Sequence, residues 1–157
     1  MKEMILNENF IDFISLLNKY EVKYVLVGGW VVIFEGYSRT TGDMDVFVEI
    51  SEANATKILQ VIKEFMGSSL GFEKEDFLNE NKVLMIGNTP LRIDIITTID
   101  GVSFEEAYKT SRIYTDDGTD IRCIHVNQLI SNKKASGRLK DLADAEMLEK
   151  ILKKRKK

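Results

Sequence analysis

The sequence has few of the features that mark secreted, disulfide-bonded or membrane-spanning proteins. Its 157 residues include one cysteine and one proline, and its apolar runs fall short of the roughly 20 residues that a bilayer-spanning helix needs. A single cysteine excludes an internal disulfide, and Cys123 in the apolar stretch IRCIHV is expected to be buried rather than reactive. The N-terminus MKEMILNENF lacks the apolar core of a signal peptide, so we expect a cytoplasmic protein with no membrane partner.

A large excess of charge of one sign is also missing. The formal net charge is -3, which argues against general DNA binding or a non-specific nucleic-acid coat. The C-terminal KKRKK is a local exception, and it favours a solvated helix end over a phosphate-binding patch. With 30% charged and 44% apolar residues, the composition is that of one soluble globular domain over residues 1–157.

Helical periodicity and capping residues predict several helices. We expect a helix over residues 8–20 with Asn7 as its N-cap, and another from Ser51 to about Met66. GGWVVIFEG is expected to form a short helix, and Ser103 with Glu106 resembles a capping box that opens another. C-terminal helices are expected from about residue 127, broken near Gly137, whereas the stretch between Met66 and residue 82 has no clear assignment.

Short apolar or alternating stretches predict strands between these helices, at residues 23–27, 43–50, 82–86, 91–99 and 112–126. GNTP joins two of them as an antiparallel pair, and Asp117-Gly118 marks the tip of a hairpin in the last. The predicted fold class is therefore α/β (α+β), with a mixed or antiparallel sheet packed with helices rather than a doubly wound parallel sheet.

The strand expected at residues 43–50 begins with two acidic side chains. Residues two apart in a strand face the same side, so Asp43 and Asp45 project together while Met44 faces away. Two like charges repel each other, and a fold keeps such a pair mainly where a cation lies between them. Mg²⁺ is the obvious candidate, because it binds carboxylate oxygens together with substrate phosphates.

A third acid, Asp94, is the only carboxylate in the apolar stretch LRIDIITTI. Burial of an unpaired carboxylate is costly, so Asp94 needs a partner. If its strand lies beside residues 43–50, three acids converge and can hold two divalent ions about a phosphoryl group. An isolated Asp-x-Asp or Gly-Gly pair is common on surface strands and turns, and it is the order of these features that indicates function.

Gly28-Gly29, the thirteen residues 30–42, Asp43-Met44-Asp45 and the later Asp94 together resemble the nucleotidyltransferase superfamily. That superfamily includes DNA polymerase beta, kanamycin-type antibiotic nucleotidyltransferases and CCA-adding enzymes. VLVGGWVVIFEGYSRTTGDMDVFV is more similar to its small stand-alone prokaryotic members, including those of toxin–antitoxin and abortive-infection systems. NQLISNKKASGRLKDLADAEML resembles their downstream Lys, Arg-x-x-Asp and Asp pattern, so the resemblance spans residues 22–148.

The resemblance implies catalytic and metal-binding roles for three acids. Asp43 and Asp45 would bind two Mg²⁺ ions, with Mn²⁺ as a possible substitute. Asp94 would complete the metal site and help to deprotonate the hydroxyl of the acceptor.

The resemblance also implies nucleotide-binding roles. The backbone N–H groups of Gly28 and Gly29 would approach the triphosphate of an NTP such as ATP, and Lys133 would neutralise part of its charge. Arg39 and Thr40 would touch phosphate or acceptor, although an ordinary surface loop explains them equally well. A further set of charged residues forms either a structural ion-pair cluster, which we favour, or part of the substrate site: Arg138, Asp141 and Asp144.

The implied reaction transfers a nucleoside monophosphate from an NTP to a hydroxyl-bearing acceptor and releases pyrophosphate. The acceptor stays open between a drug, a tRNA end, a protein side chain and a small metabolite. The chain has little room for a separate acceptor-binding domain, so a homodimer or an antitoxin partner could supply the missing wall. The alternative is a catalytically silent nucleotide- or partner-binding module of a toxin–antitoxin type system.

Overall fold

Six strands form one mixed sheet in the order β3-β4-β2-β1-β6-β5. The computed structural model describes residues 6–156. The strands are β1 (Tyr24–Val27), β2 (Met44–Val48), β3 (Val83–Ile86), β4 (Ile93–Ile96), β5 (Arg112–Asp116) and β6 (Thr119–Cys123). The helices are α1 (Glu8–Lys19), α2 (Gly29–Phe34), α3 (Glu52–Met66), α4 (Phe104–Lys109), α5 (Val126–Ser136) and α6 (Leu139–Arg155), with a 3₁₀ turn η1 (Lys74–Phe77) in the unassigned stretch. The predicted mixed α/β architecture is confirmed.

The pairing of the strands combines local hairpins with parallel contacts between distant segments. The predicted antiparallel pairs β3–β4 and β5–β6 are both present, and φ is positive at Asp117 and Gly118, as a two-residue hairpin turn requires. β2 lies between β1, to which it runs antiparallel, and β4, to which it runs parallel. This arrangement brings residues 43–50 beside the strand of Asp94.

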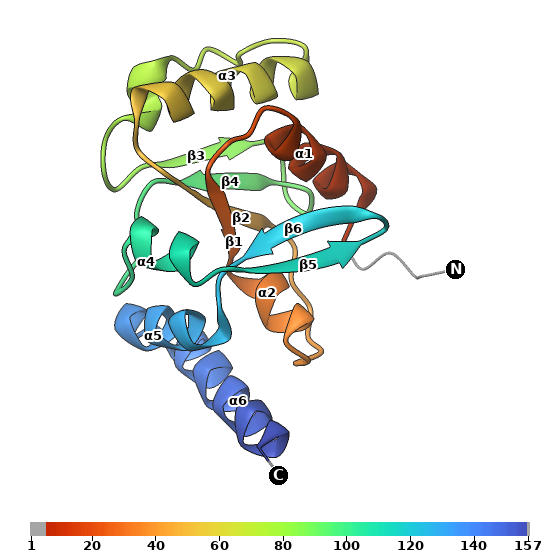
Figure 1. Ribbon diagram of the computed structural model, residues 1–157, viewed down its shortest axis with the longest axis vertical. Coiled ribbons are helices and arrows are strands. Elements are labelled where there is room, and N and C mark those ends of the chain that lie inside the picture. The colour runs from red at the N-terminus through yellow and green to blue at the C-terminus, as the bar shows by residue number, and fades with distance from the viewer. Residues whose placement is uncertain (1–5, 157) are drawn as a thin grey trace.

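The two faces of the sheet have different neighbours. Figure 1 shows α1 and α3 in the upper part of the view, α4 at mid-height on the left, and α5 and α6 below it. Val48 lies opposite Tyr24, whose hydroxyl donates to Asn18 of α1, so alternation directs Met44 and Val46 of β2 to the same side. Phe47 points the other way and packs edge-on against Phe104 of α4. Asp45 therefore lies on the face that α4 covers in part.

Capping side chains fix where the long helices begin. Asn7 accepts a hydrogen bond from the backbone N–H of Asn9 at the start of α1, and Ser51 accepts one from Asn54 at the start of α3. The break between α5 and α6 occurs at Gly137, which has a left-handed backbone conformation. These boundaries agree with the predicted ones to within about two residues.

The C-terminal helix is tied to the body of the domain at its far end. Arg155 lies 2.9 Å from Oε1 of Glu35, a side chain only 1% exposed, and donates a second hydrogen bond to the backbone carbonyl of Glu35. Lys153, Lys154 and Lys156 are exposed, as expected of a solvated helix end, and Lys157 lies outside the described residues. Arg155 is also exposed, at 44% of its side chain, but it pairs with Glu35 as well. Within residues 6–156, every helix is too short or too polar to cross a membrane.

We expect Asn54→Ala to destabilise the fold by about 3 kcal/mol. The buried Asn54 amide accepts from the backbone N–H of Lys23 and donates to the carbonyls of Lys23 and Glu49, so it joins α3 to the segments that flank β1 and β2. Urea unfolding measures the loss. Thr56→Ala is the control, since that exposed hydroxyl bonds only within its own helix, and an equal effect of both variants would contradict the assignment.

Candidate functional site

A polar cleft of about 880 Å³ brings together every residue that the sequence indicates as a site residue. It lies where β1, β2 and β4 approach α5 and the start of α6. The candidate residues that line it are Gly28, Gly29, Arg39, Thr40, Asp43, Asp45, Asp94 and Lys133. Segments far apart in the sequence thus meet at one place, as the site prediction requires.

The three candidate carboxylates meet through the parallel pairing of β2 with β4. Asp45 lies directly opposite Asp94 in the ladder, so both side chains project to the same face, and Asp43 precedes β2 by one residue. Burial, reinforced by the charge of Asp94, raises the pKa of Asp45 to about 6. The fold therefore holds acidic groups close together at a cost in free energy.

A guanidinium group already neutralises two of these acids. Nε of Arg92 lies 2.7 Å from Oδ1 of Asp94, and Nη2 lies 3.1 Å from Oδ2 of Asp94 and 3.0 Å from Oδ2 of Asp43. Among residues 6–156, groups of three or more His, Cys, Asp or Glu side chains arranged to hold a metal ion are absent. Asp43 and Asp94 thus share one cationic group, the guanidinium of Arg92, whereas Asp45 forms no ion pair with it.

Sequence reasoning missed Arg92. The available signal was its position two residues before Asp94, which places both side chains on the same face of the strand. A basic residue next to an otherwise isolated strand acid is a candidate for its ion-pair partner.

The two glycines allow close approach by side chains of the cleft. Gly28 has φ of +78°, and a Cβ atom there would clash with the carboxylate of Asp45. A Cβ atom at Gly29 would clash with the hydroxyl of Thr41 and would lie 3.1 Å from Nη2 of Arg39. Gly28 and Gly29 are therefore required for the packing of the cleft.

A buried ion-pair network connects the cleft to the C-terminal helices. Nζ of Lys133 lies 3.1 Å from Asp141 and 3.1 Å from Asp144, and the same Asp144 oxygen lies 2.9 Å from Nη2 of Arg39. Only 8% of the Lys133 side chain and 14% of the Arg39 side chain are exposed. Arg39 is thus a buried link to α6 rather than part of an ordinary surface loop, whereas Thr40 is exposed.

Arg138 forms the outer edge of this network. Its Nε lies 3.0 Å from Oδ2 of Asp141, but 80% of its side chain is exposed at the mouth of the cleft. Asp141 also accepts a hydrogen bond from Ser136. Lys134, beside Lys133 in sequence, points elsewhere and pairs with Glu149 on the surface. The favoured structural ion-pair cluster therefore includes Lys133.

Two further residues with reactive side chains lie outside the cleft. Cys123 is fully buried, as expected, and burial raises the pKa of its thiol, so it is a packing residue. His125 follows β6, and its Nδ1 accepts a hydrogen bond from the backbone N–H of Asn127 at the start of α5. His125 therefore caps a helix.

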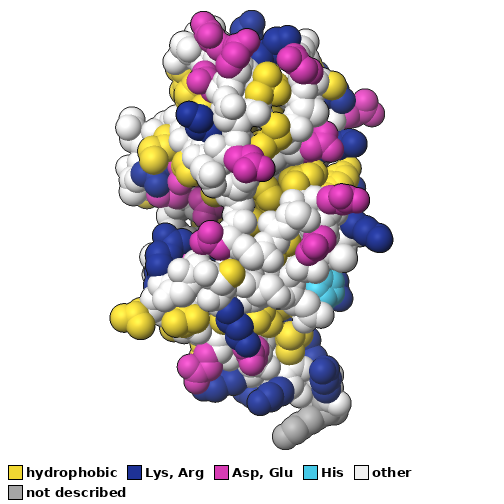
Figure 2. All heavy atoms as spheres, turned by 90° about the vertical axis from the view of Figure 1, so that its left-hand side faces the viewer, with side chains coloured by type: hydrophobic (Ala, Val, Ile, Leu, Met, Phe, Trp, Pro, Cys, Tyr) yellow, Lys and Arg dark blue, Asp and Glu magenta, His cyan; other side chains and the backbone are white. Residues whose placement is uncertain are grey.

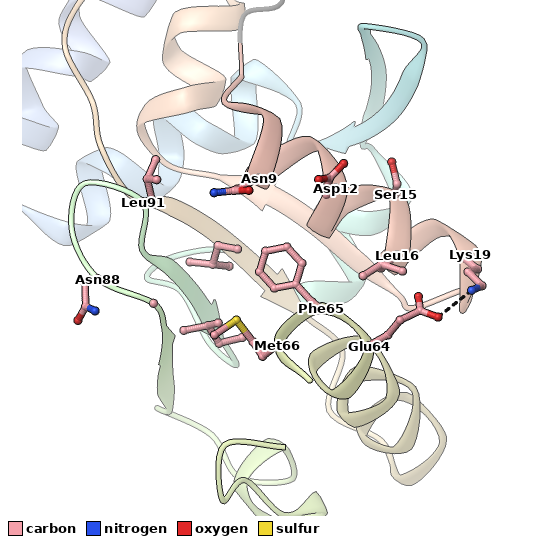
Figure 3. A pocket seen from close by; sticks show the side chains of 13 residues that line it. Asn9, Asp12, Ser15, Leu16, Lys19, Glu64, Phe65, Met66, Asn88 and Leu91 are labelled. Carbon is pink, nitrogen blue, oxygen red and sulfur yellow. Dashed lines mark hydrogen bonds and ion pairs between the residues drawn. The ribbon is translucent and has the colours of Figure 1, made fainter. Parts of the chain in front are cut away.

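A second hollow, of about 850 Å³, lies between α1, the end of α3 and the turn that joins β3 to β4. Figure 3 shows Leu16, Phe65 and Met66 around it, with the ion pair of Lys19 and Glu64 at one end. None of the eight candidate residues lines it. The polar cleft is therefore the candidate functional site.

We expect Asp45→Asn to stabilise the metal-free protein at pH 8 by up to about 3 kcal/mol. The pKa of Asp45 is raised from 3.8 to about 6 in the folded state, so ionisation between these values destabilises the wild-type fold. The gain in unfolding free energy of Asp45→Asn over the wild type is therefore fully present above pH 6 and decreases as the pH falls through 6. Urea unfolding with EDTA at pH 8 and pH 5 measures it.

Asp43→Asn provides the matched control for this stability measurement. It removes a carboxylate that contacts Arg92, so we expect no gain in stability at pH 8. The same stability difference between Asp45→Asn and wild type at both pH values would refute the buried, charge-repelled state of Asp45.

Comparison with known proteins identifies the fold. Family models and curated protein sequences gave no match. Among solved structures, the lincosamide antibiotic adenylyltransferase LnuA, with lincomycin bound, is 14% identical with a TM-score of 0.58, over 95% of this chain and 99% of that one. A candidate nucleotidyltransferase from Thermotoga maritima is 16% identical with a TM-score of 0.56, over 92% and 91% of the two chains.

The third similar structure is an antigenic nucleotidyltransferase-like protein from Paracoccidioides brasiliensis. It is 9% identical with a TM-score of 0.55, over 91% of this chain and 74% of that one. At such low identities the matches establish the fold alone. The chain has the nucleotidyltransferase fold that its glycine and aspartate pattern predicts.

Proposed function

We propose that the protein is a divalent-metal-dependent nucleotidyltransferase, which transfers a nucleoside monophosphate from an NTP to an acceptor hydroxyl. The observation that carries this proposal is the register of β2 and β4, which sets Asp45 opposite Asp94 in a cleft with Asp43. The nucleotidyltransferase fold of the similar structures supports it. In a purely structural protein, the mutual repulsion of three neighbouring acids would lower stability without a compensating gain.

The carboxylates fit a divalent cation by their chemistry. All three offer oxygen ligands of the kind that Mg²⁺ prefers, with Mn²⁺ as a substitute, and Arg92 shows that a positive charge is stable between Asp43 and Asp94. A metal ion bound there would neutralise phosphate charge and lower the pKa of the attacking hydroxyl. Its binding requires that Arg92 leave at least one of its two partners.

The remaining residues of the cleft would hold and orient the nucleotide. Gly28 and Gly29 pack directly against Asp45, Thr41 and Arg39, so the absence of side chains at these two positions lets the backbone come close to the acids. Their backbone N–H groups would approach the triphosphate, with Lys133 and Arg39 as cationic groups in the same cleft. Lys133 shares its charge between two carboxylates in this structure, so phosphate oxygens would have to compete with Asp141 or Asp144 for it. Thr40, being exposed, is free to contact nucleotide or acceptor.

The reaction itself needs few protein groups. The acceptor oxygen attacks the α-phosphorus of the NTP, the bond to the β-phosphate oxygen breaks, and pyrophosphate leaves. Asp94 accepts the proton of the acceptor hydroxyl once Arg92 no longer occupies its oxygens. Most of the rate acceleration would come from positioning and charge neutralisation.

A second candidate function is nucleotide binding without turnover, as in a silent module of a toxin–antitoxin type system. Arg92 favours this binding-only function, because its guanidinium group pairs with both Asp43 and Asp94 and can hold the two acids together without a metal ion. Asp45 argues against it, since this acid lies beside Asp94 without an ion pair of its own to Arg92 and stays costly to ionise.

We expect Arg92→Gln to bind Mn²⁺ about tenfold more tightly than the wild type in the absence of nucleotide, because a competing charge-assisted interaction is removed. Calorimetric titration of Mn²⁺ measures the affinity directly, without turnover. Arg112→Gln, an exposed arginine outside the cleft, is the control. Unchanged or weaker Mn²⁺ binding in Arg92→Gln would show that Arg92 does not occupy the cation site.

We expect the double variant Asp43→Ala/Asp45→Ala to lose Mg²⁺-dependent NTP binding and to release pyrophosphate at least about 10²-fold more slowly. Calorimetry with the four NTPs and a pyrophosphate assay test the two properties separately. Asp12→Ala/Glu75→Ala removes the same charge from exposed positions outside the cleft, and should behave as the wild type.

Each result of that experiment selects between the two functions. Retained pyrophosphate release in the Asp43→Ala/Asp45→Ala protein would refute the site assignment. Mg²⁺-dependent NTP binding by the wild type, with no pyrophosphate release for any class of acceptor, would identify the silent binding module instead.

A further inference from the structure

The overall charge of -3 conceals a strong division along the chain. Residues 126–157 contain ten Lys or Arg residues and four Asp or Glu residues. Residues 1–125 contain twelve Lys or Arg residues and twenty-one Asp or Glu residues. The C-terminal helices are thus a basic arm on an acidic body. Figure 2 shows Lys and Arg side chains gathered at the lower end of the molecule, where α6 lies in Figure 1.

Structural ion pairs account for only part of this basic charge. Lys133 is buried in the network of the cleft, Arg155 binds the buried Glu35, and Lys134 pairs with Glu149. Several basic side chains remain exposed: Arg138, Lys140, Lys150, Lys153, Lys154 and Lys156.

Three of the exposed lysines lie along one side of α6. Lys140, Ala143, Met147, Lys150 and Lys154 are separated by steps of three and four residues, which places them on a single stripe of the helix, called here the lysine stripe. The stripe itself contains no acid. Glu146 lies 3.5 Å from Lys150, but both side chains are more than half exposed, so this pair is weak and easily exchanged.

The lysine stripe begins at the mouth of the candidate active site. Lys140 and the exposed Arg138 both line the cleft that holds Asp43, Asp45 and Asp94. From Lys140 to Lys154 the stripe extends about 21 Å along the helix. A chain of phosphates lying on it would deliver one end into the cleft, while the acidic body would repel the same chain elsewhere.

We infer that the acceptor is a nucleic acid, whose backbone phosphates bind the lysine stripe and whose terminal hydroxyl enters the cleft. This inference rests on the proposed function and names the class of its acceptor. The stripe has no aromatic residue on which bases could stack, so recognition there depends on phosphate charge and is sensitive to salt.

The test uses single-stranded RNA of about 20 nucleotides with a free 3′-hydroxyl, and the same RNA with a 3′-phosphate. The variant is Lys150→Gln/Lys154→Gln, whose positions lie outside the cleft, and the matched control is Lys63→Gln/Lys109→Gln on the acidic body. We expect the stripe variant to bind both RNAs about tenfold more weakly at low salt, and its plot of log affinity against log salt to be shallower by about 1.4.

Transfer of label from α-labelled NTP should occur to the 3′-hydroxyl RNA only, with a raised KM and unchanged kcat in the stripe variant. Mg²⁺-NTP affinity, measured separately, reports on the proposed function itself. Normal NTP binding with no RNA binding by the wild type would overturn the acceptor inference alone, in favour of an acidic protein or a small hydroxyl compound. Equal loss in the stripe and control variants, or RNA binding without labelling, would also overturn it.

Discussion

The arrangement of the cleft depends on the mutual repulsion of three carboxylates, those of Asp43, Asp45 and Asp94. Asp45 and Asp94 lie opposite each other on parallel strands that the hydrophobic core holds in register, so the acids cannot move apart without loss of that pairing. Arg92 supplies the counter-charge for two of the three acids from the same strand region. The core therefore fixes three acids of which Arg92 pairs with only two, and this uncompensated negative charge is the physical basis of the proposed divalent-cation site.

The C-terminal helices depend on a second set of ion pairs and in turn complete the cleft. Asp144 of α6 binds Arg39 from the loop before β2 and Lys133 from α5, so one buried carboxylate holds two walls of the cleft together. Removal of one partner from such a buried network leaves an uncompensated charge, which is far more costly than loss of a surface pair. The same contacts that fold the arm onto the domain therefore set the positions of two cationic groups that face the cleft.

Local sequence patterns predicted the helices, the strands and the direction of single side chains. Features that depend on contacts between residues far apart in the sequence could not be predicted in this way. Helix ends followed from Asn7 and Ser51 because capping is a property of adjacent residues. The common direction of Asp43 and Asp45 followed from strand periodicity, but the adjacency of Asp94 was conditional, because sequence does not show which distant strands pair. Arg92 was overlooked although its position two residues before Asp94 is a local signal for that ion pair, whereas its contact with Asp43 depends on the pairing of β2 with β4. The link from Arg155 to Glu35 spans 120 residues, and no local pattern indicates it.

Because negative and positive charge lie in different parts of the chain, the two binding steps of the proposed reaction, nucleotide binding and acceptor binding, would depend on different solution conditions. A triphosphate that enters beside the three acids meets like charge, so its entry depends on a divalent cation that offsets both partners. A phosphodiester chain on the basic arm meets lysines that are present in every state of the protein, so its binding needs no metal but weakens as salt screens the attraction. A chain that carried the same net charge evenly over its surface could not separate the two steps. In the proposed reaction, three acids in the cleft beside a basic helix would allow nucleotide and acceptor to bind under independent control.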